Sequence, residues 1–112
     1  MKLITAAIQK KLDKNFQNQN DKDVVLKLFG GEKYGACTWL ITQMEPDGDI
    51  MWGLCDIGLG CCEYGTVSLS ELKSIRFKPF GLGVERDMYF KGGKVEDYQK
   101  YYDEHQSLNG CR

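Results

Sequence analysis

The placement of the glycines most constrains what this chain can fold into. None of its 13 glycines precedes Gly30, and twelve of them fall between Gly30 and Gly93. Glycine adopts turn conformations that other residues resist, and it is unfavourable inside a helix. The middle of the chain is therefore predicted to consist of short strands and turns, and the helices are expected near the two ends.

Four strands are expected in and around this middle region. Runs of β-branched and alternating apolar residues predict strands over 24–29, 37–44, 50–57 and 84–90. Between the second and third of these, the sequence Glu45-Pro46-Asp47-Gly48 places proline and glycine at turn positions, which predicts a β-hairpin. Residues 58–65 contain three glycines and are expected to form a compact loop, followed by only two extended residues.

Three helices are expected around these strands. Apolar residues spaced four apart, from Ile4 to Phe16, predict an N-terminal helix with Thr5 as its N-cap. Ser68 and Glu71 form a capping box that opens a helix of about two turns, and residues 94–106 predict a tyrosine-rich C-terminal helix. This order predicts a single α+β domain over residues 1–112, with a small antiparallel sheet of about four strands.

Charge and cysteine content narrow the classes of function. The chain has 15 basic and 16 acidic residues, so no global charge favours nucleic acid or an anionic membrane. The charge is nevertheless uneven, because residues 1–29 hold six basic and three acidic residues, whereas residues 30–70 hold one and six. No apolar run reaches the length of a membrane span or of a signal-peptide core, so we expect a cytoplasmic protein that does not contact a membrane.

The cysteines are expected to be free thiols. Their number, five, is odd, no two have the Cys-x-x-Cys spacing, and the chain has a single histidine, His105. The sequence therefore predicts neither a metal site nor a cofactor, and no catalytic residue stands out.

The most unusual local chemistry is the run Glu85-Arg86-Asp87 inside an expected strand. Alternation places Arg86 on an apolar face, where it needs a carboxylate partner or a route to solvent. Asp56 lies beside apolar residues on its own strand and is the natural partner. We predict an Arg86–Asp56 pair that fixes the strand register, and the alternative is a functional site that uses Arg86, Asp56 or Glu85.

Two surfaces are the candidates for contact with a partner, namely the acidic segment 30–70 and the tyrosine-rich C-terminal helix. Together with the charged run of the expected last strand, they give the following candidate binding residues: Asp56, Glu63, Tyr64, Glu85, Arg86, Asp87, Tyr98, Tyr101 and Tyr102.

Three motifs in the second half of the chain resemble one bacterial family. They are Cys55-Asp56-Ile57-Gly58-Leu59-Gly60, Val67-Ser68-Leu69-Ser70-Glu71-Leu72 and Gly81-Leu82-Gly83-Val84-Glu85-Arg86-Asp87. The sequence is similar to the family known as domain of unknown function 2958 over about residues 1–91, and the tail 92–112 looks divergent. The resemblance implies carriage on plasmids, integrative elements and phages, and it implies no established activity.

Small accessory proteins of mobile elements often act by binding. The first hypothesis is therefore a non-enzymatic inhibitor of a host defence system, whose partner is a host protein, a protein–nucleic-acid complex or a small signalling nucleotide. The second is a maintenance or transfer factor that binds replication proteins or DNA through Lys10, Lys11 and Lys14. The third is a small nucleotide-acting enzyme with Asp56, Glu85 and Arg86 in one pocket. The sequence leaves the oligomeric state open.

Overall fold

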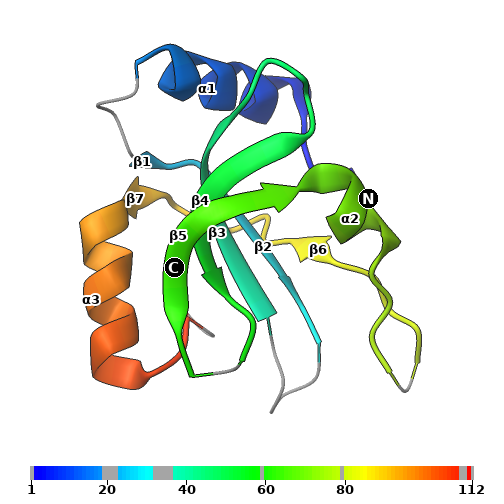
Figure 1. Ribbon diagram of the computed structural model, residues 1–112, viewed down its shortest axis with the longest axis vertical. Coiled ribbons are helices and arrows are strands. Elements are labelled where there is room, and N and C mark those ends of the chain that lie inside the picture. The colour runs from blue at the N-terminus through cyan, green and yellow to red at the C-terminus, as the bar shows by residue number, and fades with distance from the viewer. Residues whose placement is uncertain are drawn as a thin grey trace.

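The centre of the fold is a five-stranded antiparallel sheet, one strand larger than expected (Figure 1). The computed structural model describes residues 2–18, 23–31, 37–58, 60–78, 80–108 and 111. The strands of the main sheet are β2 (Leu26–Gly30), β3 (Cys37–Met44), β4 (Ile50–Asp56), β5 (Cys62–Ser68) and β6 (Glu85–Arg86). They lie in the order β5-β4-β3-β2-β6. A separate two-stranded sheet pairs β1 (Asp23–Val24) with β7 (Gly93–Lys94).

The predicted hairpin between β3 and β4 is present. Glu45 N–H donates to the Ile50 carbonyl at 2.8 Å, which closes the turn. The Asp47 carboxylate inside the turn accepts hydrogen bonds from the backbone amides of Asp49 and Ile50 at 2.8 and 3.0 Å. The turn is thus stabilised by its own residues, which is why the sequence predicts it well.

Two other expectations about the strands are wrong. Residues 62–65, expected to be part of a loop, belong to β5, which pairs with β4 along its whole length and sets Gly65 opposite Gly53. Conversely, the strand expected over residues 84–90 is only two residues long. Its continuation turns away because the Asp87 carboxylate accepts the Tyr89 amide at 2.9 Å.

The three helices occur where the sequence predicts them, and the fold is α+β. They are α1 (Ala6–Gln17), α2 (Leu69–Ser74) and α3 (Val95–His105). Thr5 caps α1 by accepting the Ile8 amide at 3.2 Å, and Ser68 caps α2 by accepting the Glu71 amide at 3.3 Å. In the ranges that the structure describes, none of these helices has both the length and the apolar character needed to cross a bilayer.

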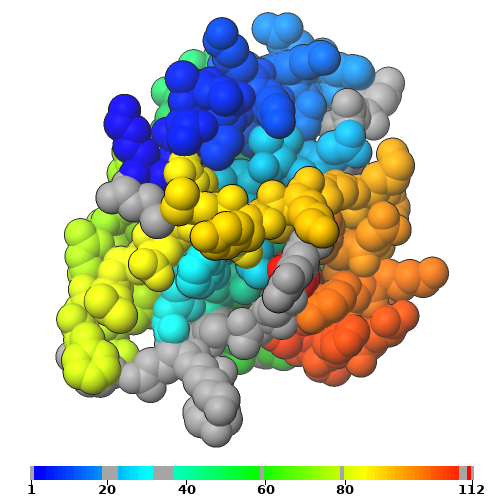
Figure 2. All heavy atoms as spheres, turned by 180° about the vertical axis from the view of Figure 1, so that it is seen from behind, coloured from blue at the N-terminus to red at the C-terminus, as the bar shows by residue number. Residues whose placement is uncertain are grey.

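Helices cover both faces of the main sheet, so the core has two parts. Helices α1 and α2 cover one face, and the fully buried side chains there include Leu12, Leu28, Ile41, Met51 and Leu72. Helix α3, together with Leu108 and Cys111, covers the other face, over Leu40 and Leu54. Seen from behind, the segment from β6 to β7 crosses the molecule between α1 and α3 (Figure 2).

Candidate functional site

Asp56, the first of the sequence-predicted site residues, is buried and uses both carboxylate oxygens on the backbone. Its side chain lies at the end of β4 and the residue is 3% exposed. Oδ1 accepts the Gly58 amide at 3.0 Å, and Oδ2 accepts the Leu108 amide at 2.9 Å. Asp56 therefore holds the turn after β4 and the segment after α3 against each other.

The predicted Arg86–Asp56 pair does not form, because the two residues face opposite sides of the sheet. Arg86 lies opposite Leu28 in the β2–β6 register and so shares the face that α1 and α2 cover. Asp56 binds Leu108 on the α3 face. A pair that fixes the register of these two strands would need β6 beside β4, whereas β2 and β3 lie between them. Arg86 Nη1 is instead buried, with no hydrogen-bond partner among the described residues.

Asp87 has a buried partner that sequence reasoning missed. Lys27 Nζ lies 3.6 Å from Asp87 Oδ2 and donates to the Cys111 carbonyl at 2.7 Å. Lys27 is the second residue of β2, in an apolar run, and a lysine in such a position is a signal that could have revealed this pair. Like Asp56, the Lys27–Asp87 pair holds the C-terminal segment in place. Glu63 and Glu85 are exposed.

The candidate tyrosines mainly have packing roles. Tyr98 and Tyr102 are each 6% exposed and lie in the core beneath α3. Burial raises the pKa of Tyr98 to about 12. Tyr101 stacks on His105 with ring centroids 4.1 Å apart, and the Tyr64 hydroxyl hydrogen-bonds Thr42 Oγ1 at 2.8 Å. The nine candidate residues are thus distributed over both faces of the sheet and do not form one site.

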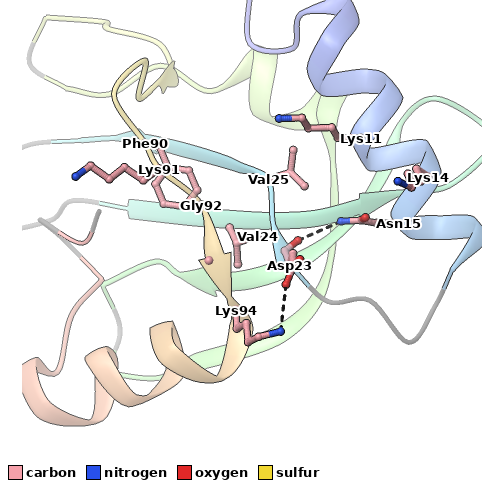
Figure 3. A pocket seen from close by; sticks show the side chains of 11 residues that line it. Lys11, Lys14, Asn15, Asp23, Val24, Val25, Phe90, Lys91, Gly92 and Lys94 are labelled. Carbon is pink, nitrogen blue, oxygen red and sulfur yellow. Dashed lines mark hydrogen bonds and ion pairs between the residues drawn. The ribbon is translucent and has the colours of Figure 1, made fainter.

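A groove between α1 and the segment leading into β7 carries the most distinctive chemistry of the described surface (Figure 3). Its volume is about 560 Å³. Among the residues that the structure describes, four exposed lysines line it: Lys11, Lys14, Lys91 and Lys94. We call this feature the lysine groove. Figure 3 shows Lys11 and Lys14 on α1 along one side and Lys94 along the other, while the Lys91 side chain extends away from α1.

The α1 side of the lysine groove is fixed by Asn15, which is 7% exposed. Asn15 Nδ2 donates to the Thr42 carbonyl at 2.9 Å and to the Asp23 carbonyl at 3.2 Å. One side chain therefore joins α1 to both β3 and β1. Because Lys11 lies one helical turn before Asn15 and Lys14 is its neighbour, this anchor holds both lysines along the groove.

The opposite side depends on the pairing of β1 with β7. Asp23 lies opposite Lys94 and Val24 opposite Gly93 in that register. Gly92, just before β7, has φ +82°, and a Cβ added to it would lie 2.9 Å from the Val24 carbonyl oxygen. A side chain at this position would be strained and would also collide with β1. Glycine thus allows the close approach that brings Lys91 and Lys94 to the groove.

The groove combines positive charge with an apolar floor. Val24, Val25 and Phe90 contribute the apolar surface, and Asp23 is the only acidic residue among the described residues of the lining. Asp23 Oδ1 lies 3.8 Å from Lys94 Nζ, but the two side chains are 52% and 73% exposed, so the pair is weak. Lysine ammonium groups bind phosphates as point charges, so this arrangement suits an anionic ligand.

The described residues also give no support for a metal site. Across the described ranges, no three His, Cys, Asp or Glu side chains gather closely enough to hold an ion.

Comparison with models of known protein families identifies the family of this chain. A family model described as "Protein of unknown function (DUF2958)" matches residues 3–108. The chain belongs to this DUF2958 family. The match extends beyond residue 91 and includes β7 and α3, so both Lys91 and Lys94 lie within the matched region. No curated protein and no solved structure matches the chain significantly.

Proposed function

We propose that this DUF2958 protein is a non-enzymatic binding protein whose lysine groove takes the phosphates of single-stranded nucleic acid. The observation that carries the proposal is the convergence of Lys11 and Lys14, near one end of the chain, with Lys91 and Lys94, near the other. Four lysines in the lining of one groove give a local excess of positive charge in a protein whose formal net charge is −1.

A single strand suits the groove better than a duplex does. Proteins that bind single strands without sequence preference combine a positive groove for the backbone with aromatic surface for the bases. Phe90 supplies that surface in the lysine groove, and the residue is half-buried, with its ring centroid 5.6 Å from that of Tyr98. With about four phosphate contacts, we expect a non-specific Kd of about 10⁻⁴ to 10⁻⁶ M at physiological salt.

This ligand fits the hypothesis of a mobile-element maintenance or transfer factor that binds DNA. Of the three lysines named for that role, Lys11 and Lys14 line the groove, and Lys10 is exposed outside it. An inhibitor of a host defence system would use the same groove on the nucleic-acid component of a defence complex. The enzyme hypothesis named Asp56, Glu85 and Arg86 for one pocket, and Asp56 and Arg86 lie on opposite faces of the sheet.

Fluorescence anisotropy with a labelled 15-nucleotide oligothymidylate tests the proposal. We expect the Lys11→Gln/Lys14→Gln variant to bind about tenfold more weakly than the unmodified protein. The control, Lys73→Gln/Lys78→Gln, makes the same charge change at two exposed lysines outside the groove. It should bind within about twofold of the unmodified protein. Equal losses in the two variants would show that only net charge matters and would contradict a specific groove.

Competition with a free mononucleotide distinguishes two possible ligands of the groove, a nucleic-acid strand and a single nucleotide. If the groove tracks a backbone, thymidine monophosphate should compete only at much higher phosphate concentration than unlabelled oligothymidylate. Equal competition per phosphate would instead favour a small nucleotide as the ligand.

A further inference from the structure

The main sheet has one long edge that no other element of the described chain covers by pairing. Strand β6, at one edge, has two residues, whereas β5, at the other, has seven. Proteins usually protect long edge strands with lysine, proline, bulges or shortness. Strand β5 (Cys62–Ser68) has neither lysine nor proline, and Glu63 is its single charged residue. This edge therefore offers backbone groups to another strand.

The pairing pattern identifies which groups are offered. Leu69 N–H donates to the Asp49 carbonyl at 2.9 Å, and Val67, two residues earlier, lies opposite Met51. Backbone groups alternate in direction along an antiparallel strand, so Val67 and Gly65 direct theirs toward β4. Thr66, between them, directs its N–H and carbonyl away from β4, and the residue is exposed.

A groove beside this edge favours a positively charged partner. It lies between α3 and strands β4 and β5, has a volume of about 450 Å³, and has Leu54, Tyr64 and Val95 as its apolar lining. Its polar lining includes three carboxylates and one lysine, namely Glu96, Asp97, Asp103 and Lys100. The groove therefore carries a net negative charge. It shares no residue with the lysine groove.

We propose that an extended segment of a partner protein adds to β5 as a sixth strand and places a basic side chain over this acidic groove. Main-chain hydrogen bonds to groups such as those of Thr66 would provide affinity. Alternate side chains of the added strand would contact the acidic groove and provide specificity. Charge complementarity selects a basic partner over a second copy of this chain. Pairing β5 with β5 would bring two identical acidic surfaces together, which is unfavourable.

Isothermal titration calorimetry with two synthetic nonapeptides tests this inference. One alternates lysine with valine, and the other alternates glutamate with valine. We expect the lysine peptide to bind at least about tenfold more tightly than the glutamate peptide. Absence of binding by the lysine peptide, or equal binding of both peptides, would overturn the proposal. The lysine groove is not involved, so a failure here leaves the oligonucleotide result unaffected.

Two substitutions of one residue test the role of the strand edge. Thr66→Pro removes an outward N–H without removing a hydrogen bond to β4, a position at which edge strands tolerate proline. Thr66→Val keeps the N–H. We expect Thr66→Pro to weaken binding of the lysine peptide at least about tenfold and Thr66→Val to change it less than about twofold. Circular dichroism spectra that match that of the unmodified protein confirm that each variant is folded.

Two further results would overturn the inference. One is equal peptide binding by the Thr66→Pro and Thr66→Val variants. The other is a concentration-dependent dimer in sedimentation that Thr66→Pro abolishes, because it would make a second copy the occupant of this edge. A complementary variant, Asp97→Asn/Asp103→Asn, should reduce the preference for the lysine peptide while retaining binding through the backbone.

Discussion

Asp56 binds two backbone amides that come from different parts of the chain, and each oxygen serves one of them. In the sequence the same residue resembles a functional carboxylate, because it stands beside apolar residues in a glycine-rich motif. A carboxylate that accepts from two amides satisfies donors that burial would otherwise leave unpaired. The Asp56 carboxylate, which resembles a functional group in the sequence, therefore has a structural role.

Asp56→Asn should destabilise the protein by about 1–3 kcal/mol, because the amide NH₂ would face one of the two N–H donors. Urea denaturation at neutral pH measures the loss. Hydrogen exchange should increase at Leu108, whose amide loses its acceptor in one orientation of the asparagine. Unchanged stability would show that Asp56 does not hold the C-terminal segment.

The cysteines should differ in reactivity according to burial. Burial raises the pKa of Cys55 to about 11 and that of Cys62 to about 12, and it also raises the pKa of Cys111. At pH 8 the thiolate fraction of Cys55 is then on the order of one in a thousand. Cys61 is exposed. Iodoacetamide at pH 8 should therefore modify Cys61 first, as mass spectrometry of the peptides would report.

The same pKa values fix the sign of the pH dependence. A thiol whose pKa is raised by folding favours the folded state fully below its unfolded pKa of about 8.5, and this contribution is lost as pH rises through the folded pKa. We expect the buried thiols to contribute to a loss of stability between about pH 9 and pH 12. Rapid modification of Cys55 or Cys62 at pH 8 in the folded protein would contradict this assignment.

At the scale of the elements, the sequence correctly predicted the turn and the helix starts, because these are stabilised by contacts between residues close together in the chain. The hairpin turn is stabilised by Asp47, α1 is capped by Thr5 and α2 by Ser68, and all three residues lie inside or next to the element they stabilise. Strand β5 was missed because its formation depends on pairing with β4, which outweighs the turn tendency of its glycine. The Arg86–Asp56 prediction failed for a related reason, since strand order is not encoded locally.

Gly92→Ala tests the element that forms one side of the lysine groove. Gly92 has φ +82° and its added Cβ would meet the Val24 carbonyl, so we expect a loss of about 1–3 kcal/mol in stability and weaker oligonucleotide binding. Gly48→Ala is a matched control, because Gly48 has φ +74° with nothing within 4 Å of its added Cβ. The control should lose about 1 kcal/mol and bind normally. Equal oligonucleotide binding by the two variants would show that the position of β7 does not matter for ligand binding in the lysine groove.

At the scale of the whole molecule, the lysine groove depends on contacts between distant segments. The sequence indicated Lys11 and Lys14 as a basic cluster, but it gave no sign that Lys91 and Lys94 would join them. That juxtaposition follows from the β1–β7 pairing and from the Asn15 anchor, both of which connect distant parts of the chain. The nearly balanced total charge did not indicate that Lys91 and Lys94 add to the basic residues of α1, because composition carries no information about position.

The salt dependence of oligonucleotide binding tests the central claim most directly. Each phosphate contact made by a lysine releases counterions, so with about four contacts the logarithm of the association constant should fall with the logarithm of salt concentration with a slope of about −3. Removing two contacts in the Lys11→Gln/Lys14→Gln variant should reduce the slope to about −1.5. A slope near zero for the unmodified protein, or the same slope in both proteins, would contradict phosphate binding in the lysine groove.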